Sequence, residues 1–158
     1  MFGYAQHGKD TVAEMIQDEL SLTFESSSLF AAECAVLPYL KRRGITYDSV
    51  HEAYADRDNH RAHWKAAIKA YNTPDLTRLT REIFAAYDIY VGCRDRDEFL
   101  ASRDIYDLVI WVDASKRKPQ EATCQITADD CDLIIPNNGT EAELRERVER
   151  VSRWIRTQ

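Results

Sequence analysis

The first residues of the chain form a pattern that can bind phosphate. The run from Gly3 to Thr11 reads GYAQHGKDT, so it fits the spacing G-x-x-x-x-G-K. Glycines let the backbone turn so that its N–H groups converge on phosphate oxygens, and a helix that follows adds the positive end of its dipole. The alternative is a glycine loop that only turns the chain into a helix. The residues expected to contact a nucleotide are Gly3, Gln6, His7, Gly8, Lys9, Asp10 and Thr11.

The lysine and the residues after it suit a nucleotide with its magnesium ion. Lys9 would reach the outer phosphates, and Asp10 or Thr11 stands where a hydroxyl group usually holds Mg²⁺, directly or through water. Asp113 ends the apolar run 108–112 and could be a further oxygen ligand; the alternative is that it caps the next turn. ATP and Mg²⁺ are therefore the expected cofactors.

Two arginines follow an apolar run that predicts a strand. Arg94 and Arg96 come directly after Ile89–Cys93, and the carboxyl ends of parallel strands border the crevice in which ligands bind. Arginine can hold a phosphate through two hydrogen bonds. If the bound nucleotide passes its γ-phosphate to a second substrate, the acceptor, then Arg94 is the first candidate for holding the acceptor or the γ-phosphate. A surface ion pair of Arg94 with Asp95 or Asp97 is the alternative.

Further basic residues could approach phosphates from a loop and from a helix. The segment 115–119 (SKRKP) would form a very short lid, with Arg117 as the arginine that touches the phosphates, although a basic surface loop also explains it. Arg78 and Arg81 lie on one face of a predicted helix and could face an acceptor; otherwise they are solvated.

The stretch 56–64 combines acidic, basic and aromatic side chains. If it is helical, Arg57, Arg61 and Trp64 lie on neighbouring faces and could bind an acceptor, with the indole stacked on a nucleotide base. A hydroxyl acceptor must lose a proton, so Asp56 or Asp58 is a candidate general base.

Two other interpretations of this stretch stay open. The charged residues could simply form a solvated helix with pairs four residues apart. Asp56, His60 and His63 also have a spacing that could bind a metal ion, which is the less favoured interpretation because the charges are mixed.

Length and composition indicate one globular domain. The chain has 158 residues, of which 44% are hydrophobic and 30% charged, and its net charge of −6 argues against a broadly basic DNA-binding face. No signal peptide and no apolar run long enough to cross a bilayer is recognised. The four cysteines have no zinc-type spacing, so we expect unpaired thiols in a cytoplasmic protein.

The hydrophobic pattern predicts helices that alternate with buried strands. Strands are expected at 22–28, 89–93, 108–112 and 133–135, the last three because short apolar runs without alternation suit a parallel sheet. Helices are expected after the glycine loop, at 29–43, over 47–72, from Thr73 as N-cap with Pro74 as first residue, and from the capping box of Thr140 and Glu143. The predicted fold is a three-layer α/β sandwich with a parallel sheet. Only Met1 and Phe2 precede the loop, so we expect a gap at the centre of the sheet or compensation by its neighbours.

Three segments carry a resemblance to a known family. GKDT after a glycine loop resembles the phage deoxynucleoside monophosphate kinase group of P-loop kinases. Residues 91–98 resemble the strand end where that group has a substrate-facing arginine, and 132–140 resemble its late strand and the turn beside the adenine, which implies that Asn138 and Gly139 contact the nucleotide. Residues 26–28 and 55–61 are similar to phage P-loop kinases that phosphorylate 5-hydroxymethyluridine in DNA during thymine hypermodification, which implies a role for Ser27 at the acceptor.

This resemblance implies one P-loop NTPase domain of the nucleotide-kinase type over residues 1–158, with a helical acceptor-binding insertion at about 29–86. The implied activity is transfer of the γ-phosphoryl group of ATP to a deoxynucleotide acceptor. The implied compartment is the cytoplasm, which for a phage protein is the cytoplasm of its host. A short lid favours, by a narrow margin, a hydroxymethyl group in DNA, whereas the acidic net charge favours a free monophosphate. A nucleotide-binding switch and a kinase that only binds its ligand are the alternatives of another class.

Overall fold

The computed structural model describes residues 1–158 and contains four short strands, arranged as two parallel pairs. The first pair joins β1 (Phe24–Ser26) to β2 (Ile89–Val91), and the second joins β3 (Ile110–Asp113) to β4 (Leu133–Pro136). The three predicted apolar strands are confirmed as β2, β3 and β4. The strand predicted at 22–28 is shorter, because a helix already begins at Ser27.

The first two residues of the chain lie between the two strand pairs. Met1 exchanges backbone hydrogen bonds with β2, since its amino group donates to Tyr90 and its carbonyl accepts from Gly92. Phe2 forms a parallel bridge with β3, to which it is joined by two hydrogen bonds of 2.8 Å. The strands therefore follow one another in the order β1, β2, residues 1–2, β3, β4. The expected central gap is filled by two residues, because each of them bonds to the strand on its own side.

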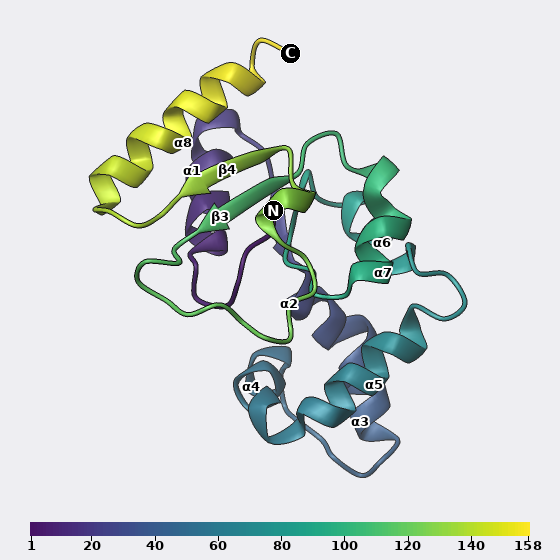
Figure 1. Ribbon diagram of the computed structural model, residues 1–158. Coiled ribbons are helices and arrows are strands. Elements are labelled where there is room, and N and C mark those ends of the chain that lie inside the picture. The colour runs from purple at the N-terminus through teal and green to yellow at the C-terminus, as the bar shows by residue number, and fades with distance from the viewer.

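Helices cover both faces of these strands (Figure 1). On one face α1 (Lys9–Leu20) and α8 (Glu141–Ile155) pack together, and their apolar residues form one core cluster with Val112. The opposite face carries α2 (Ser27–Ala31), α6 (Arg78–Phe84) and α7 (Arg96–Ser102). Their apolar residues share a second cluster with Trp111, because neighbouring residues of a strand point to opposite faces.

The middle of the chain forms a helical lobe below the strands (Figure 1). It contains a π-helical segment (Ala32–Val36), α3 (Leu37–Lys41), α4 (Val50–Ala55), a 3₁₀ turn (Arg57–His60) and α5 (Arg61–Tyr71). The helices predicted at 29–43 and 47–72 are thus present but interrupted. A third core cluster holds the lobe together, and its members are Ala32, Val36, Leu40, Trp64 and Ala67.

Helix starts are where the sequence predictions differ most from the structure. The predicted start at Thr73 and Pro74 is wrong: the Thr73 hydroxyl donates to the carbonyl of Lys69 at 2.7 Å and so closes α5, while α6 begins at Arg78. Helix α7 was not predicted, although Asp95 caps it by accepting two backbone N–H groups. The capping box at the start of α8 is confirmed in both of its hydrogen bonds.

The four cysteines are free thiols, in agreement with the prediction from their spacing. None of the helices is both long and apolar enough to cross a lipid bilayer.

Candidate active site

The glycine loop adopts a backbone that only glycines suit at its two ends. Gly3 has a φ of +144° and Gly8, which precedes α1, a φ of +87°. A Cβ atom would lie 2.6 Å from the carbonyl oxygen of Val112 at the first position, and 2.5 Å from Nδ2 of Asn137 at the second. The loop is therefore fitted closely against the ends of β3 and β4, at the carboxyl edge of the strands, where ligands of parallel α/β proteins bind.

Lys9 folds back over the loop. It is the first residue of α1, and its ammonium donates to the carbonyl oxygen of Tyr4 at 2.8 Å. Burial lowers the pKa of Lys9, and the nearby carboxylate of Asp10 partly opposes this. A charge held above the loop, with little water around it, interacts strongly with an incoming phosphate.

Ser27 lies beside Lys9. Its hydroxyl donates to the carbonyl oxygen of Gly92, which follows β2 with a φ of +89°. A Cβ atom at Gly92 would lie 3.5 Å from Oγ of Ser27 and 3.9 Å from Cε of Lys9, so the three residues are neighbours. The structure thus brings the predicted acceptor residue next to the predicted phosphate-binding lysine.

His7 anchors the loop through its side chain. The imidazole is fully buried, and its Nδ1 accepts the backbone N–H of Ala114 at 2.9 Å, which places the proton on Nε2. That Nε2 is buried without a hydrogen-bond partner. The side chain therefore fixes the loop to the end of β3 and is not available to a nucleotide.

Asn137 is a site residue that the sequence analysis missed. Its buried side-chain amide donates to the backbone carbonyl oxygen of His7 at 3.0 Å, and the backbone carbonyl oxygen of Asn137 accepts from Arg117. Asn137 therefore connects the glycine loop, the end of β4 and the basic segment 115–119. The only sequence signal was its place in the polar run NNGT directly after a predicted strand.

Asp113 caps a turn. Its carboxylate accepts from the backbone of Ser115 at 3.0 Å and from Nδ2 of Asn138 at 2.9 Å, and Asn138 also accepts from the backbone of Lys116. Burial would raise the pKa of Asp113, but these hydrogen bonds outweigh it and lower the pKa. The geometry favours the capping role over the magnesium role that the sequence also allowed.

The remaining magnesium candidates are open to solvent. Asp10 and Thr11 are exposed at the start of α1, and neither side chain has a hydrogen-bond or ion-pair partner in the structure. No group of three or more His, Cys, Asp or Glu side chains is placed to hold a metal ion. Asp10 and Thr11 offer a carboxylate and a hydroxyl, which are the kind of oxygen donor that Mg²⁺ takes.

Asn138 and Gly139, expected at the nucleotide, serve the end of β4 and the start of α8. Asn138 is occupied by Asp113 and Lys116. A Cβ atom at Gly139 would lie 1.9 Å from the carboxylate of Glu143, so glycine leaves room for the capping box of α8.

A carboxylate occupies the glycine loop. Glu121 accepts the backbone N–H of Ala5 at 3.1 Å and pairs with Arg94 at 3.1 Å. A neighbouring cavity of about 380 Å³ is lined by the loop, by the segment 118–123 and by Arg61 of the helical lobe. Glu121 was not predicted, because nothing in its local sequence distinguishes it. It holds both a loop N–H group and the arginine that we expected to bind phosphate.

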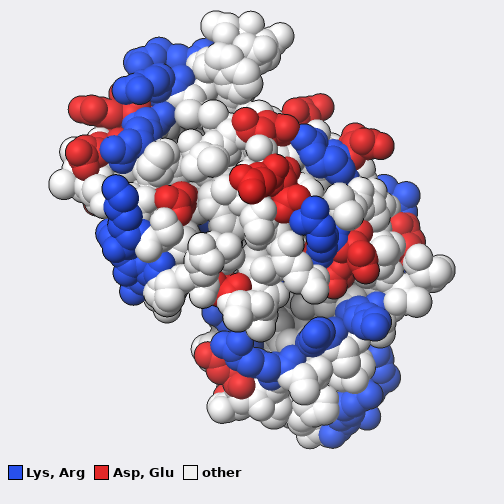
Figure 2. All heavy atoms as spheres, viewed as in Figure 1, with Lys and Arg blue, Asp and Glu red and all other residues white.

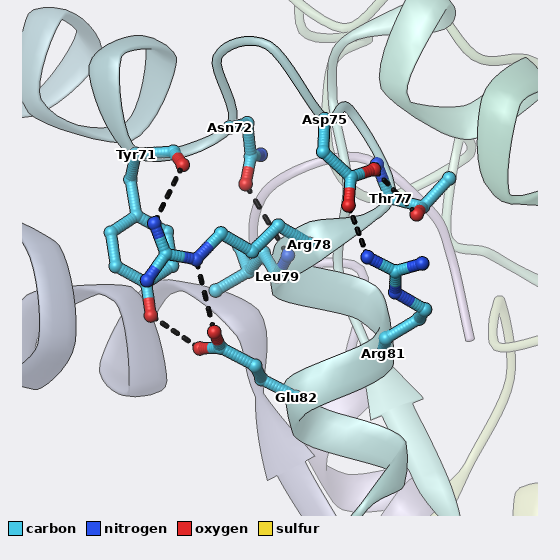
Figure 3. A network of polar contacts seen from close by, with 8 residues as sticks. All are labelled: Tyr71, Asn72, Asp75, Thr77, Arg78, Leu79, Arg81 and Glu82. Atoms are coloured by element: carbon cyan, nitrogen blue, oxygen red, sulfur yellow. Dashed lines mark hydrogen bonds and ion pairs between the residues drawn. The ribbon is translucent and has the colours of Figure 1, made fainter.

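Most of the other predicted arginines are bound to their own chain. Arg96 pairs with Asp130 at 2.9 Å, and Arg117 donates to the carbonyl oxygen of Asn137 at 2.8 Å. Arg78 stacks on the ring of Tyr71 and pairs with Glu82 at 3.0 Å, in the network shown in Figure 3. These contacts favour structural roles for Arg78 and Arg96, and they require Arg117 to leave its carbonyl partner before it can touch a phosphate.

The two candidate bases differ in their partners. Asp56 accepts from the hydroxyl of Tyr47 at 2.6 Å and from Asn59, and the bond from Tyr47 is the main reason that the pKa of Asp56 is lowered. A carboxylate with a lowered pKa is a weaker base. Asp58 instead pairs at 3.0 Å with Arg61, which lines the cavity.

The predicted stacking role of Trp64 is wrong. Trp64 is only 7% exposed and packs in the core of the lobe beside Tyr54, so its ring is not available to stack on an acceptor base. His60 pairs with Asp56 at 3.3 Å, but with His63 they form no metal-binding group. Helical spacing alone could not show which face of α5 would be buried.

The sequence matches no protein-family model and no curated protein. The resemblance to P-loop kinases therefore rests on the sequence segments quoted above and stays a prediction.

Proposed function

We propose that this chain is an ATP-dependent phosphotransferase of the P-loop kinase type. The observation that carries the proposal is the glycine loop, which leads into α1 at the carboxyl edge of parallel strands and has Lys9 folded over it. Backbone N–H groups and the helix end suit phosphate oxygens, and Lys9 suits the charge that moves during transfer. The adjoining cavity gives a second ligand access to the loop.

The residues of the chain have separable tasks in this proposal. The loop holds the β-phosphate, and Lys9 bridges the β- and γ-phosphates. Asp10 or Thr11 would hold a Mg²⁺ ion, which neutralises phosphate charge when bound. Nucleotide binding would displace Glu121 from the N–H of Ala5, which frees Arg94 for the γ-phosphate or the acceptor.

The acceptor that we favour is a deoxynucleotide hydroxyl, such as the hydroxymethyl group of 5-hydroxymethyluridine in DNA. Its oxygen attacks the γ-phosphorus, the bond to the bridging oxygen of ADP breaks, and the hydroxyl proton passes to a carboxylate, for which Asp58 is the candidate. A free deoxynucleoside monophosphate is the alternative acceptor, and it needs no general base. The four free thiols suit an enzyme of the reducing cytoplasm.

The test is transfer of labelled γ-phosphate from ATP with Mg²⁺. Single-stranded DNA that contains hydroxymethyluridine and free deoxynucleoside monophosphates are offered side by side. We expect label in the DNA and a loss of at least about a hundredfold in rate for Lys9→Ala, as for other groups that stabilise transition-state charge. Lys41→Ala, at an exposed lysine that ends α3, is the matched control.

The other outcomes separate the alternatives. Label only in nucleoside diphosphates would establish a monophosphate kinase. No label in either acceptor, with ATP still bound, would overturn the kinase proposal and favour a nucleotide-binding switch.

A further inference from the structure

The exposed face of α5 carries a regular row of basic residues, which we name the α5 stripe. Arg61, Lys65 and Lys69 are exposed and follow one another at intervals of four residues, whereas Arg57, in the 3₁₀ turn before α5, stacks on the ring of Tyr54. Residues four apart lie on one face of a helix, about 6 Å apart along its axis. Figure 2 shows a row of Lys and Arg side chains across the helical lobe at the place of α5.

The charge of the stripe is weakly compensated. Lys65 and Lys69 take part in no ion pair, and the pair of Arg61 with Asp58 is about 70% exposed on both sides, so it is easily exchanged. The lobe also contrasts with the rest of the chain. Residues 29–86 hold nine Lys and Arg against seven Asp and Glu, whereas the remainder holds 12 against 20.

The stripe continues into the candidate active site. Arg61 lines the cavity beside the glycine loop, together with Gln6 and Lys118. A ligand that lies along α5 therefore has one end at the cavity. The residue that directly follows each of these basic residues is an exposed alanine, at positions 62, 66 and 70, so the surface beside the row permits close approach of a bulky chain.

We propose that the α5 stripe binds the sugar–phosphate backbone of the single-stranded DNA that carries the acceptor base. This rests on the proposed function, and it assigns the substrate class to a polymer. Evenly spaced cations suit a repeating polyanion, and a free mononucleotide would need only the first of them. A base must leave the stack of a duplex before its substituent can enter an active site, which favours a single strand.

A membrane fits the same surface less well. Amphipathic helices that bind lipid insert an apolar face, whereas the apolar face of α5 is buried through Trp64 and Ala67 in the core of the lobe.

The experiment measures binding of a fluorescent single-stranded oligodeoxynucleotide by anisotropy, without ATP, over a range of salt concentrations. The variant is Lys65→Gln with Lys69→Gln. The matched control is Arg150→Gln with Arg153→Gln, which removes two exposed charges from α8. We expect the α5 variant to bind about tenfold more weakly at low salt, and its slope of log K against log salt to fall by about 1.4, for two lost phosphate contacts.

Three results would overturn the proposal: no DNA binding by the unaltered protein, equal losses in both variants, or binding to phosphatidylserine vesicles with the same dependence on Lys65 and Lys69. Failure of the kinase proposal is separate. DNA phosphorylation with an unchanged KM in the α5 variant would leave the kinase standing and remove the stripe. DNA binding that depends on the two lysines, without phosphorylation of any acceptor, would support the stripe and remove the kinase.

Discussion

Gly8 is the residue at which the loop becomes a helix, and two separate features disfavour any other residue there. The backbone is left-handed, and the amide of Asn137 lies where a side chain would begin. We expect Gly8→Ala to lower the free energy of unfolding by about 2–3 kcal/mol, because left-handed strain and displacement of Asn137 add together. Urea denaturation measures the change.

Gly44 offers the matched control for this prediction. It is also left-handed, with a φ of +77°, but a Cβ atom there would meet nothing within 4 Å. Gly44→Ala should therefore cost only the backbone strain, about 1–2 kcal/mol. Equal costs at the two glycines would show that the contact with Asn137 is unimportant.

In the proposed function, Glu121 is the residue that an incoming nucleotide would displace. Glu121→Gln keeps an oxygen that can accept from Ala5 but removes a negative charge from the phosphate site. We expect ATP to bind severalfold more tightly, because the carboxylate no longer repels phosphates or competes for Arg94. Isothermal titration calorimetry measures the Kd. Glu141→Gln, a charge loss on exposed α8, should leave it unchanged, and an unaltered Kd for Glu121→Gln would contradict the displacement.

At the scale of elements, α8 depends on its first turn. The Thr140 hydroxyl accepts the N–H of Glu143, whose carboxylate in turn accepts the N–H of Thr140. Thr140→Ala should lower the free energy of unfolding by about 1 kcal/mol, because an N–H group of the first turn loses its acceptor. Thr140→Ser keeps the hydroxyl and should be nearly neutral in the same denaturation experiment; an equal loss in both variants would point to packing of the methyl group instead.

The segment from β3 to β4 supplies two charged side chains to the candidate site. Arg117 donates to the backbone carbonyl oxygen of Asn137, and Glu121 accepts from Ala5 and pairs with Arg94. In the proposed reaction both residues would exchange these partners when phosphates bind.

For the whole molecule, acid should be destabilising. Hydrogen bonds, opposed by burial, lower the pKa of Asp113, and a bond from Arg96 lowers that of Asp130. A carboxylate with a lowered pKa in the folded state binds protons more readily when unfolded, so its stabilisation is present above the unfolded pKa of 3.8 and is lost as pH falls below it. The free energy of unfolding should therefore decrease from pH 5 to pH 3.

Glu98 opposes this trend, because burial raises its pKa and protonation then favours the folded state. Denaturation at several pH values tests the balance. Asp130→Asn should show a shallower loss of stability in acid than the unaltered protein, and an unchanged slope would exclude Asp130 as a contributor.

Local patterns determined much of this protein. The glycine loop, the three apolar strands and the cap of α8 follow from residues that are neighbours in the sequence, since turn geometry, strand burial and capping act over a few residues. Because these signals act only over a few residues, they also explain why the start of α6 was predicted wrongly and why α7 was missed. The residue types at Thr73, Pro74 and Asp95 can mark either the end of one helix or the start of another. Only the fold selects between the two.

Tertiary structure decided which side chains of the candidate site are free to bind a ligand and which are bound to other residues or buried. Ala5 and Glu121 meet across 116 positions of the chain, and Asn137 reaches His7 across 130, so no local pattern could pair them. Burial of Trp64 likewise depends on which face of α5 meets the lobe core. A hydrogen bond or an ion pair requires its partner within a few ångströms, and that distance is fixed by the packing of the whole chain.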